Sequence, residues 1–253
     1  MTSQPHDKNV IQQFGERASA YLSSAVHAQG EDLQQLAALV QGQSQARVLD
    51  LGCGAGHVAF HVAPQVASVI ACDLSEEMLA VVGQGAVERK LDNIRTQAAA
   101  AEKLPFTDGE FDIVISRFSA HHWRDVGAGL REARRVLKAG GQLAIVDIVS
   151  PGHPLLDTWL QTVEVLRDTS HVRDYSVAEW SRLLAEAGFI TEDLKLRRLR
   201  MEFASWIARM RTPTVLADAI RALQGKSAEE VRRHFQIEED GSFTIDSATL
   251  VCR

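Results

Sequence analysis

Between residues 46 and 149, short apolar runs alternate with stretches of helical periodicity. A typical helical stretch is 125–137, whose apolar side chains repeat on one face and which we expect to end at the glycines that follow it. Strands alternating with helices in this way form a parallel sheet covered by helices on both faces. The pattern therefore predicts an α/β fold with a doubly wound sheet, whose first five strands are expected at 46–51, 68–74, 93–99, 111–117 and 142–149.

The pattern changes after Ser150-Pro151-Gly152. Helices are expected at 154–169, 177–187, 203–223 and 227–235, and two further strands at 189–199 and 242–252. We expect these helices to cover the carboxyl edge of the sheet, where open α/β sheets bind their ligands. Together with helical character over 10–40, this divides one domain of 253 residues into a helical flap (1–45), a core (46–150), and a helical cap with the last two strands (151–253).

Composition excludes several classes of function. The net charge of −6 argues against a large nucleic-acid surface, and the basic run KLRRLR (195–200) alternates leucines with charges as a half-exposed strand does. No window approaches the roughly 20 apolar residues that cross a membrane, and the N-terminus lacks the features of a signal peptide. Three widely spaced cysteines favour free thiols over a disulfide scaffold or a zinc site. A cytoplasmic protein without a bound metal is expected, and its oligomeric state stays open.

The run VLDLGCGAGH at 48–57 carries the strongest functional signal. Gly52, Gly54 and Gly56 let the backbone turn sharply after a strand and let a ligand approach without meeting a Cβ atom. Asp50 lies at the end of that strand, where a carboxylate can receive an ammonium group. Asp73 ends the second strand, where an acidic side chain can accept the hydroxyls of a ribose. The pattern predicts a nucleotide-like ligand.

Two other nucleotide-binding motifs do not match this run. A nicotinamide-binding turn prefers G-x-G-x-x-G, whereas here His57 stands where the third glycine would be. A phosphate-binding P-loop requires Gly-Lys-Ser/Thr, which the turn lacks.

Four segments together resemble the class I S-adenosylmethionine-dependent methyltransferases. They are VLDLGCGAG, CDLS followed by Met78, LPFTDGEFDIVIS, and RVLKAGGQLAIVD. The likeness is greatest to the ubiquinone/menaquinone C-methyltransferase branch and covers about residues 10–200. It implies a Rossmann-like, mainly parallel sheet of seven strands with the last strand antiparallel, and S-adenosyl-L-methionine as cofactor.

The resemblance also implies cofactor-binding residues. The turn that contains Gly52, Cys53, Gly54 and Gly56 would run alongside the methionine part and the adenosine of the cofactor, and Asp73 would bind the ribose hydroxyls. The adenine would lie against Leu74 and Met78, near Ala101 and Glu102. Ser116 would contribute backbone, and Tyr21 belongs to a segment that folds over the cofactor. Where the family often has an acid that accepts the adenine amino group, this chain has Ala100, which leaves adenine binding to backbone and water.

Methyl transfer requires placement of a nucleophile and, in many cases, removal of a proton. His121 and His122 follow the fourth strand, and imidazole is suited to proton transfer at neutral pH. One of them is expected to face the methyl group and the other the helix that begins near Asp125. We take His122 as the inward one. The alternative is that one of them caps or packs against that helix, with Trp123 in the core. If both rings pack away from the crevice, His153 or His171 becomes the next candidate for the base.

Further polar residues lie in the expected cap. His153, His171 and Arg173 could bind an acidic or hydroxylated substrate, or could form an ion-pair network that fixes the cap. The sequence thus predicts methyl transfer to carbon or oxygen of a small metabolite. Two alternatives stay open, namely a methyltransferase acting on a macromolecule and a non-catalytic module that binds the cofactor.

Overall fold

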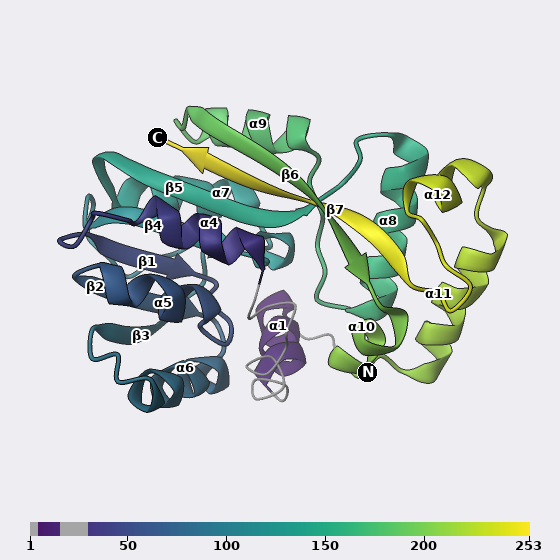
Figure 1. Ribbon diagram of the computed structural model, residues 1–253, viewed down its shortest axis with the longest axis horizontal. Helices are drawn as coiled ribbons and strands as arrows, with labels where there is room; N and C mark the ends of the chain where they lie inside the picture. Colours follow the sequence, from purple (N-terminus) through teal and green to yellow (C-terminus); the bar gives the residue numbers. More distant parts are fainter. Residues whose placement is uncertain (1–4, 16–29) are drawn as a thin grey trace.

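The computed structural model describes residues 5–15 and 30–253, and these contain a seven-stranded sheet (Figure 1). The strand order is β3-β2-β1-β4-β5-β7-β6. Neighbours among the first five strands pair in parallel, and β7 runs antiparallel to both β5 and β6, which confirms the predicted topology. The strands are β1 (Arg47–Leu51), β2 (Ser68–Asp73), β3 (Ile94–Ala98), β4 (Phe111–Arg117), β5 (Leu137–Val149), β6 (Thr191–Met201) and β7 (Phe243–Cys252).

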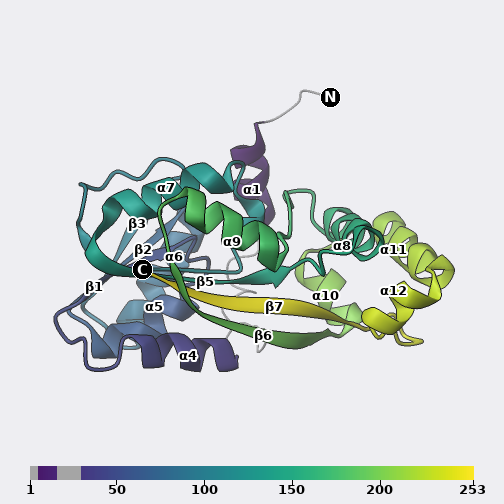
Figure 2. The ribbon, with the colours of Figure 1, turned by 90° about the horizontal axis from the view of Figure 1, so that it is seen from above.

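Helices cover both faces of the sheet. The helices α4 (Glu31–Leu39), α5 (His57–Val62) and α6 (Glu76–Glu88) lie on one face, and α7 (Val126–Val136) and α9 (Val177–Glu186) lie on the other. Figure 2 shows α7 and α9 on one side of the strands and α4 and α5 on the opposite side. Successive residues of β1 alternate between the two apolar cores, as the pleat of a strand requires. The order of connection reverses between β1 and β4, and in such sheets ligands bind at that point.

Beyond the sheet, β6 and β7 continue as a long pair that carries the helical cap. The cap consists of α8 (Pro154–Arg167), α10 (Phe203–Arg209), α11 (Thr214–Lys226) and α12 (Glu229–His234) (Figure 1). Its own core includes Trp159, Trp206, Phe235 and Phe243. The Trp159 and Phe235 ring centroids lie 4.2 Å apart, so Trp159 is a structural residue of the cap.

Three expectations about the helices were wrong. The helix at 125–137 does not reach the glycines, because Leu137 already pairs with Phe111 of β4 and the chain becomes extended there. The helix expected at 203–223 is divided between α10 and α11 at Arg211, whose φ is 49°. The helix expected at 177–187, α9, packs against α7 on a face of the sheet and not over its carboxyl edge.

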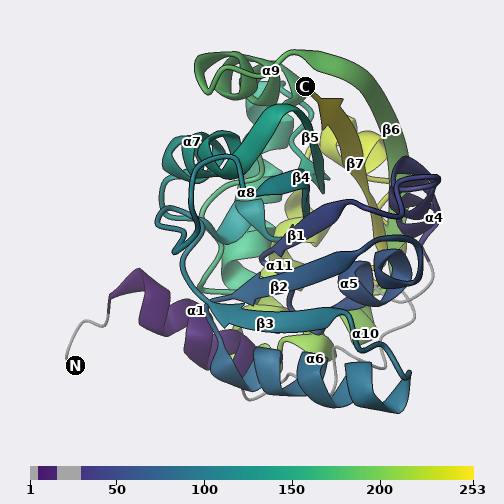
Figure 3. The same ribbon diagram turned by 90° about the vertical axis from the view of Figure 1, so that its left-hand side faces the viewer.

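Helix α1 (His6–Gly15) covers the carboxyl ends of the parallel strands, beside α6 (Figure 3). Its Asn9 side chain donates to the carbonyl of Thr169 at 2.8 Å, and the Gln13 side chain donates to the Thr169 hydroxyl at 2.8 Å. This contact joins the beginning of the chain to the loop after α8. No helix in the described part of the chain has the length and apolar character required to cross a membrane.

Candidate functional site

The turn between β1 and α5 forms the floor of the site. Gly52 has a φ of 71°, and a Cβ atom at this position would lie 1.9 Å from the Ser119 hydroxyl oxygen. Gly54 has a φ of 49°, and its N–H donates to Oδ2 of Asp73 at 2.8 Å. The left-handed backbone is accessible to glycine at little cost. The turn therefore depends on glycine for both its conformation and its contact with the loop after β4.

Asp73 holds this turn in place from the end of β2. Its Oδ2 accepts the Gly54 N–H, and its Oδ1 accepts the Ser75 N–H at 3.0 Å. Burial raises the pKa of Asp73, and these backbone donors oppose that effect. Each carboxylate oxygen can accept more than one hydrogen bond. Asp73 therefore fixes the backbone and can still receive ligand hydroxyls.

Asp50 is the second acid of this floor, and it is buried. Its Oδ2 accepts the Ala59 N–H at 3.0 Å, whereas Oδ1 is buried and accepts no hydrogen bond from any described residue. Burial raises the pKa of Asp50 to about 7. A buried oxygen without a donor is costly, and a cationic hydrogen-bond donor would relieve both effects. Asp50 is therefore suited to an ammonium group.

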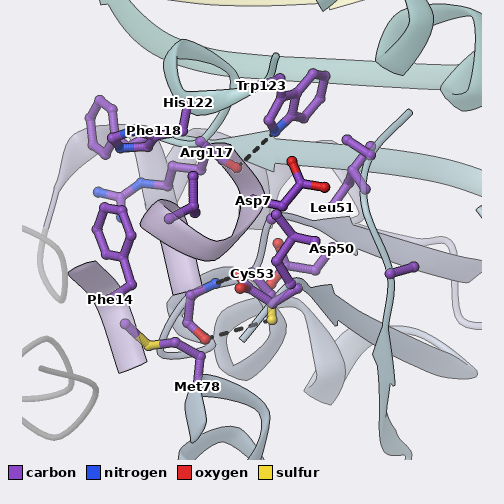
Figure 4. A pocket seen from close by; sticks show the side chains of 18 of the residues that line it. Asp7, Phe14, Asp50, Leu51, Cys53, Met78, Arg117, Phe118, His122 and Trp123 are labelled. Atoms are coloured by element: carbon purple, nitrogen blue, oxygen red, sulfur yellow. Dashed lines mark hydrogen bonds between the residues drawn. The ribbon is translucent and has the colours of Figure 1, made fainter. Parts of the chain in front are cut away.

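These residues line a pocket of about 1010 Å³ at the carboxyl ends of β1, β2 and β4 (Figure 4). Nine of the twelve predicted cofactor residues lie in its wall: Asp50, Gly52, Cys53, Gly54, Asp73, Leu74, Met78, Ala101 and Glu102. Gly56 lies outside the wall and precedes α5 with a φ of 84°, packed against Val82 and Phe60. Ser116 is buried and does not line the pocket. At the end of β4 the wall is formed by residues 117–119 instead. Tyr21 falls outside the described residues.

Several wall residues were not predicted as ligand contacts. Helix α1 contributes His6, Asp7 and Val10, and the chain after β4 contributes Arg117, Phe118 and Ser119. Phe14 of α1 lines the same pocket. Figure 4 shows Phe14, Arg117, Phe118 and His122 on one side of the pocket and Asp50, Leu51 and Cys53 on another. Phe118 has a φ of 51°, a conformation that bulky residues rarely adopt and that is concentrated at functional sites.

A second pocket, of about 630 Å³, shares Phe14, Phe118 and His122 with the first. One wall is apolar and is built from Ile148, Leu199, Met201, Trp206 and Ile245. The other is polar and is built from His121, His122, Glu164, Arg167, Asp168, Asp174 and Arg209. The two predicted catalytic histidines thus meet where the pockets join.

The histidines belong to the short turn η2 (Ala120–His122), and their ring centroids lie 4.1 Å apart. Nδ1 of His121 lies 2.5 Å from Oδ1 of Asp147, and the carboxylate also accepts the His121 backbone N–H at 3.3 Å. Burial opposes a charge on His121, but the charge and hydrogen bond of Asp147 outweigh it and raise the pKa of His121 to about 9. At neutral pH His121 is therefore an imidazolium.

His122 has the opposite character. Burial, together with the charge of His121, lowers the pKa of His122 to about 4. Its Nδ1 lies 3.1 Å from the carbonyl oxygen of Ser170, which can only accept, so we assign the hydrogen to Nδ1. Nε2 then carries a lone pair. Between about pH 4 and pH 9 the pair of rings therefore carries one positive charge, on His121.

Asp168 lies beside the lone pair of His122. Its Oδ1 accepts the Ser170 hydroxyl at 2.6 Å and the Ser170 N–H at 2.8 Å. Its Oδ2 is buried without a hydrogen-bond donor among the described residues and lies 4.0 Å from His122 Nε2. This carboxylate is placed to stabilise His122 whenever Nε2 becomes protonated.

The three predicted substrate residues take different positions. His153 is exposed at the start of α8 and lines neither pocket. Arg173 pairs with Asp157 and Glu179, at 3.2 Å and 2.9 Å, so it serves the ion-pair network that was the alternative for it. His171 is buried behind His121, with its Nε2 2.8 Å from the Gln161 side-chain oxygen, and its pKa is lowered to about 2, mainly by burial.

Neither histidine of the pair faces the helix that begins near Asp125. That position belongs to Trp123, which is buried against Gly129 and donates from Nε1 to Ser119 Oγ at 3.0 Å. Asp147 was missed as a site residue. An available signal was its place as the one charged residue in the otherwise apolar strand AIVDIV, because isolated charges are seldom buried without a partner.

Comparison with known proteins gives a consistent set of matches. A family model described as a methyltransferase domain matches residues 49–145. The Escherichia coli protein YafE is 55% identical over 195 residues, which are 77% of this chain and 94% of that protein. The Bacillus subtilis protein named as the uncharacterised methyltransferase YcgJ is 37% identical over 224 residues, or 88% of each chain.

Solved structures extend the likeness to the cap. The crystal structure of Bacillus subtilis YcgJ superposes with a TM-score of 0.84 at 33% identity, covering 88% of this chain and 97% of that one.

A more distant relative by sequence is the Agrobacterium fabrum ubiquinone/menaquinone biosynthesis C-methyltransferase UbiE, which is 32% identical over 140 residues, or 54% of each chain.

Proposed function

The chain belongs to the methyltransferase family that includes YcgJ and is an S-adenosylmethionine-dependent methyltransferase, and from this premise we propose that it methylates a carbon or oxygen atom of a small metabolite. The observation that carries the proposal is the second pocket, which adjoins the cofactor pocket and shares His122 with it.

The first pocket fits the cofactor on its own chemistry. Asp50 has a buried oxygen without a donor, which suits the ammonium group of the methionine part. Asp73 suits the ribose hydroxyls, and Leu74 and Met78 offer apolar surface to the adenine. The glycine turn leaves room for the ligand backbone, since a Cβ atom at Gly54 would have no protein atom within 4 Å.

When bound, S-adenosylmethionine supplies a methyl group that its sulfonium charge already activates. The protein then has to orient the acceptor, exclude water and remove a proton. Phe14 and Phe118 close the junction of the pockets with apolar rings. His122 is neutral at physiological pH and is placed at the same junction, so we assign it as the base that accepts the acceptor's proton.

The size and lining of the second pocket support a small acceptor with a polar and an apolar part. The Agrobacterium fabrum relative is named for C-methylation in ubiquinone and menaquinone biosynthesis, but it matches over only 54% of its length. The acceptor is therefore inferred from the pocket itself. We disfavour a macromolecular acceptor, because the second pocket is recessed between the sheet and the helices α8 and α10, as sites for small molecules usually are.

The proposal is tested by two measurements on the full chain. Calorimetry with S-adenosylhomocysteine should show binding, and labelled S-adenosylmethionine should transfer its methyl group to members of a panel of phenols, enols, carboxylic acids and amines. Binding without transfer to any member of the panel would support the alternative of a non-catalytic module. Transfer to amines alone would exclude carbon and oxygen as acceptor atoms.

A further inference from the structure

The two histidines of η2 present different chemistry to the same pocket. Asp147 occupies Nδ1 of His121, and Ser170 occupies Nδ1 of His122, so both rings are anchored through the same atom. Both rings line the second pocket, and Nε2 is the remaining polar atom of each. In His121 this atom bears a hydrogen, and in His122 it bears a lone pair. A proton donor and a proton acceptor thus lie side by side.

The surrounding charges preserve this difference. In α8, the Glu164 carboxylate lies 3.5 Å from the Arg167 guanidinium. In the loop after α8, the Asp168 carboxylate accepts a hydrogen bond from the Ser170 hydroxyl. Burial, together with the charge of Glu164, raises the pKa of Asp174 well above its usual range. The titratable and charged groups that surround the pair are Asp147 from β5, Glu164 and Arg167 from α8, Asp168, His171 and Asp174 from the loop, and Arg209 from α10.

We propose that His121, paired with Asp147, is an oxyanion-binding residue, and that the pocket selects acceptors with a weakly acidic hydroxyl, a phenol or an enol, ionised between His121 and His122. This inference rests on the proposed function and names its substrate class. Deprotonation breaks the acceptor's O–H bond, places the proton on Nε2 of His122, and leaves the electron pair on the oxygen. A preformed cation that faces developing negative charge lowers the cost of this step.

The remaining steps balance without another reactant. The electron pair of the ionised acceptor forms the bond to the methyl carbon, at the oxygen or at a conjugated carbon, and the carbon–sulfur pair stays with sulfur. Asp168 stabilises the protonated His122 until its proton passes to water. If carbon is methylated, the hydrogen on that carbon also leaves to water as a proton. An amine acceptor, in contrast, would place its own positive charge against His121.

The test uses 4-nitrophenol, whose ionised form is yellow, with the full chain and saturating S-adenosylhomocysteine. We expect bound nitrophenol to be ionised at a pH where free nitrophenol is mostly neutral, which appears as increased absorbance on adding protein. His121→Gln should weaken nitrophenolate binding roughly ten- to hundredfold, the range for hydrogen bonds to charged groups. His122→Gln should retain binding of the anion. His61→Gln, at an exposed histidine of α5, is the matched control.

Asp147→Asn provides a second variant in case His121→Gln does not fold, because it leaves both rings in place and removes the partner of the charge. It should also lose the absorbance change. Binding of neutral nitrophenol, equal binding to wild type and His121→Gln, or no binding at all would overturn the proposal. If S-adenosylhomocysteine binds in calorimetry while nitrophenolate does not, the oxyanion site fails and the cofactor site stands. If neither S-adenosylhomocysteine nor nitrophenolate binds, the proposed function fails together with the oxyanion site.

Discussion

The two pockets meet at Phe14, Phe118 and His122, but their walls differ in kind. The first is built around a single turn after β1, and the backbone N–H groups of this turn form its floor together with Asp50 and Asp73. The second takes its walls from β5, β6, β7, α8, α10 and η2, and its polar groups are charged and titratable side chains from these elements and from the loop after α8. Under the proposed assignment, cofactor recognition depends on local backbone geometry, whereas acceptor recognition depends on charged side chains from distant elements.

The largest expected effect would separate the two pockets by function. His122→Gln removes the lone pair at their junction, and turnover with the best acceptor from the panel should fall about 10²- to 10⁴-fold, the usual contribution of a general base. The affinity for S-adenosylhomocysteine should stay the same, because the contacts that we assign to the cofactor come from Asp50, Asp73, the glycine turn, Leu74 and Met78. His61→Gln is the matched control. If cofactor affinity and turnover decrease together, the two pockets are not independent.

The next effect concerns the charge in the second pocket. The pKa of His121 is raised to about 9 from an ordinary value of 6.5, so its stabilising contribution is fully present below pH 6.5 and is lost as the pH rises through 9. The stability difference between wild type and His121→Gln should therefore shrink by up to about 3 kcal/mol between pH 6.5 and 10. Urea unfolding at several pH values measures it. A constant difference would mean that His121 is neutral.

A smaller effect addresses the first pocket. Asp73→Ala removes the ribose acceptor and the anchor of the Gly54 N–H, and cofactor affinity should fall by about 1.5–3 kcal/mol. Glu76→Ala, an exposed acid at the start of α6, is the control. Calorimetry gives the affinity, and urea unfolding shows whether the variant stays folded. Unchanged affinity in a folded Asp73→Ala protein would remove Asp73 from the site.

The smallest effect tests whether the first pocket also uses charge. The pKa of Asp50 is raised to about 7, so the carboxyl ionises as the pH rises from 6 to 8. The affinity for S-adenosylhomocysteine, whose ammonium group would face Asp50, should then increase by about three- to tenfold. Asp50→Asn should remove this pH dependence, and Asp92→Asn, at an exposed position, should preserve it. The same slope in Asp50→Asn and wild type would place the ammonium group elsewhere.

Most of the fold, and the glycine turn after β1 that lines the first pocket, could be predicted, because each rests on residues near one another in the sequence. Strands and helices have their own periodicity, and the turn from Gly52 to Gly56 has a conformation that glycine adopts at little cost. Errors arose where a distant partner decided the outcome. Leu137 leaves the helix to pair with Phe111, and α9 joins the sheet layer through its contact with α7.

The sequence by itself determined an α/β chain with a nucleotide-binding turn and two acids at the ends of neighbouring strands. Only the tertiary structure decided which of the two histidines carries a positive charge at neutral pH. His121 and His122 are chemically identical and adjacent, and their difference arises because Asp147 reaches one ring from β5 while the loop after α8 holds the other. A protonation state depends on the charges and burial around a group, and these come from residues that are far apart in the chain.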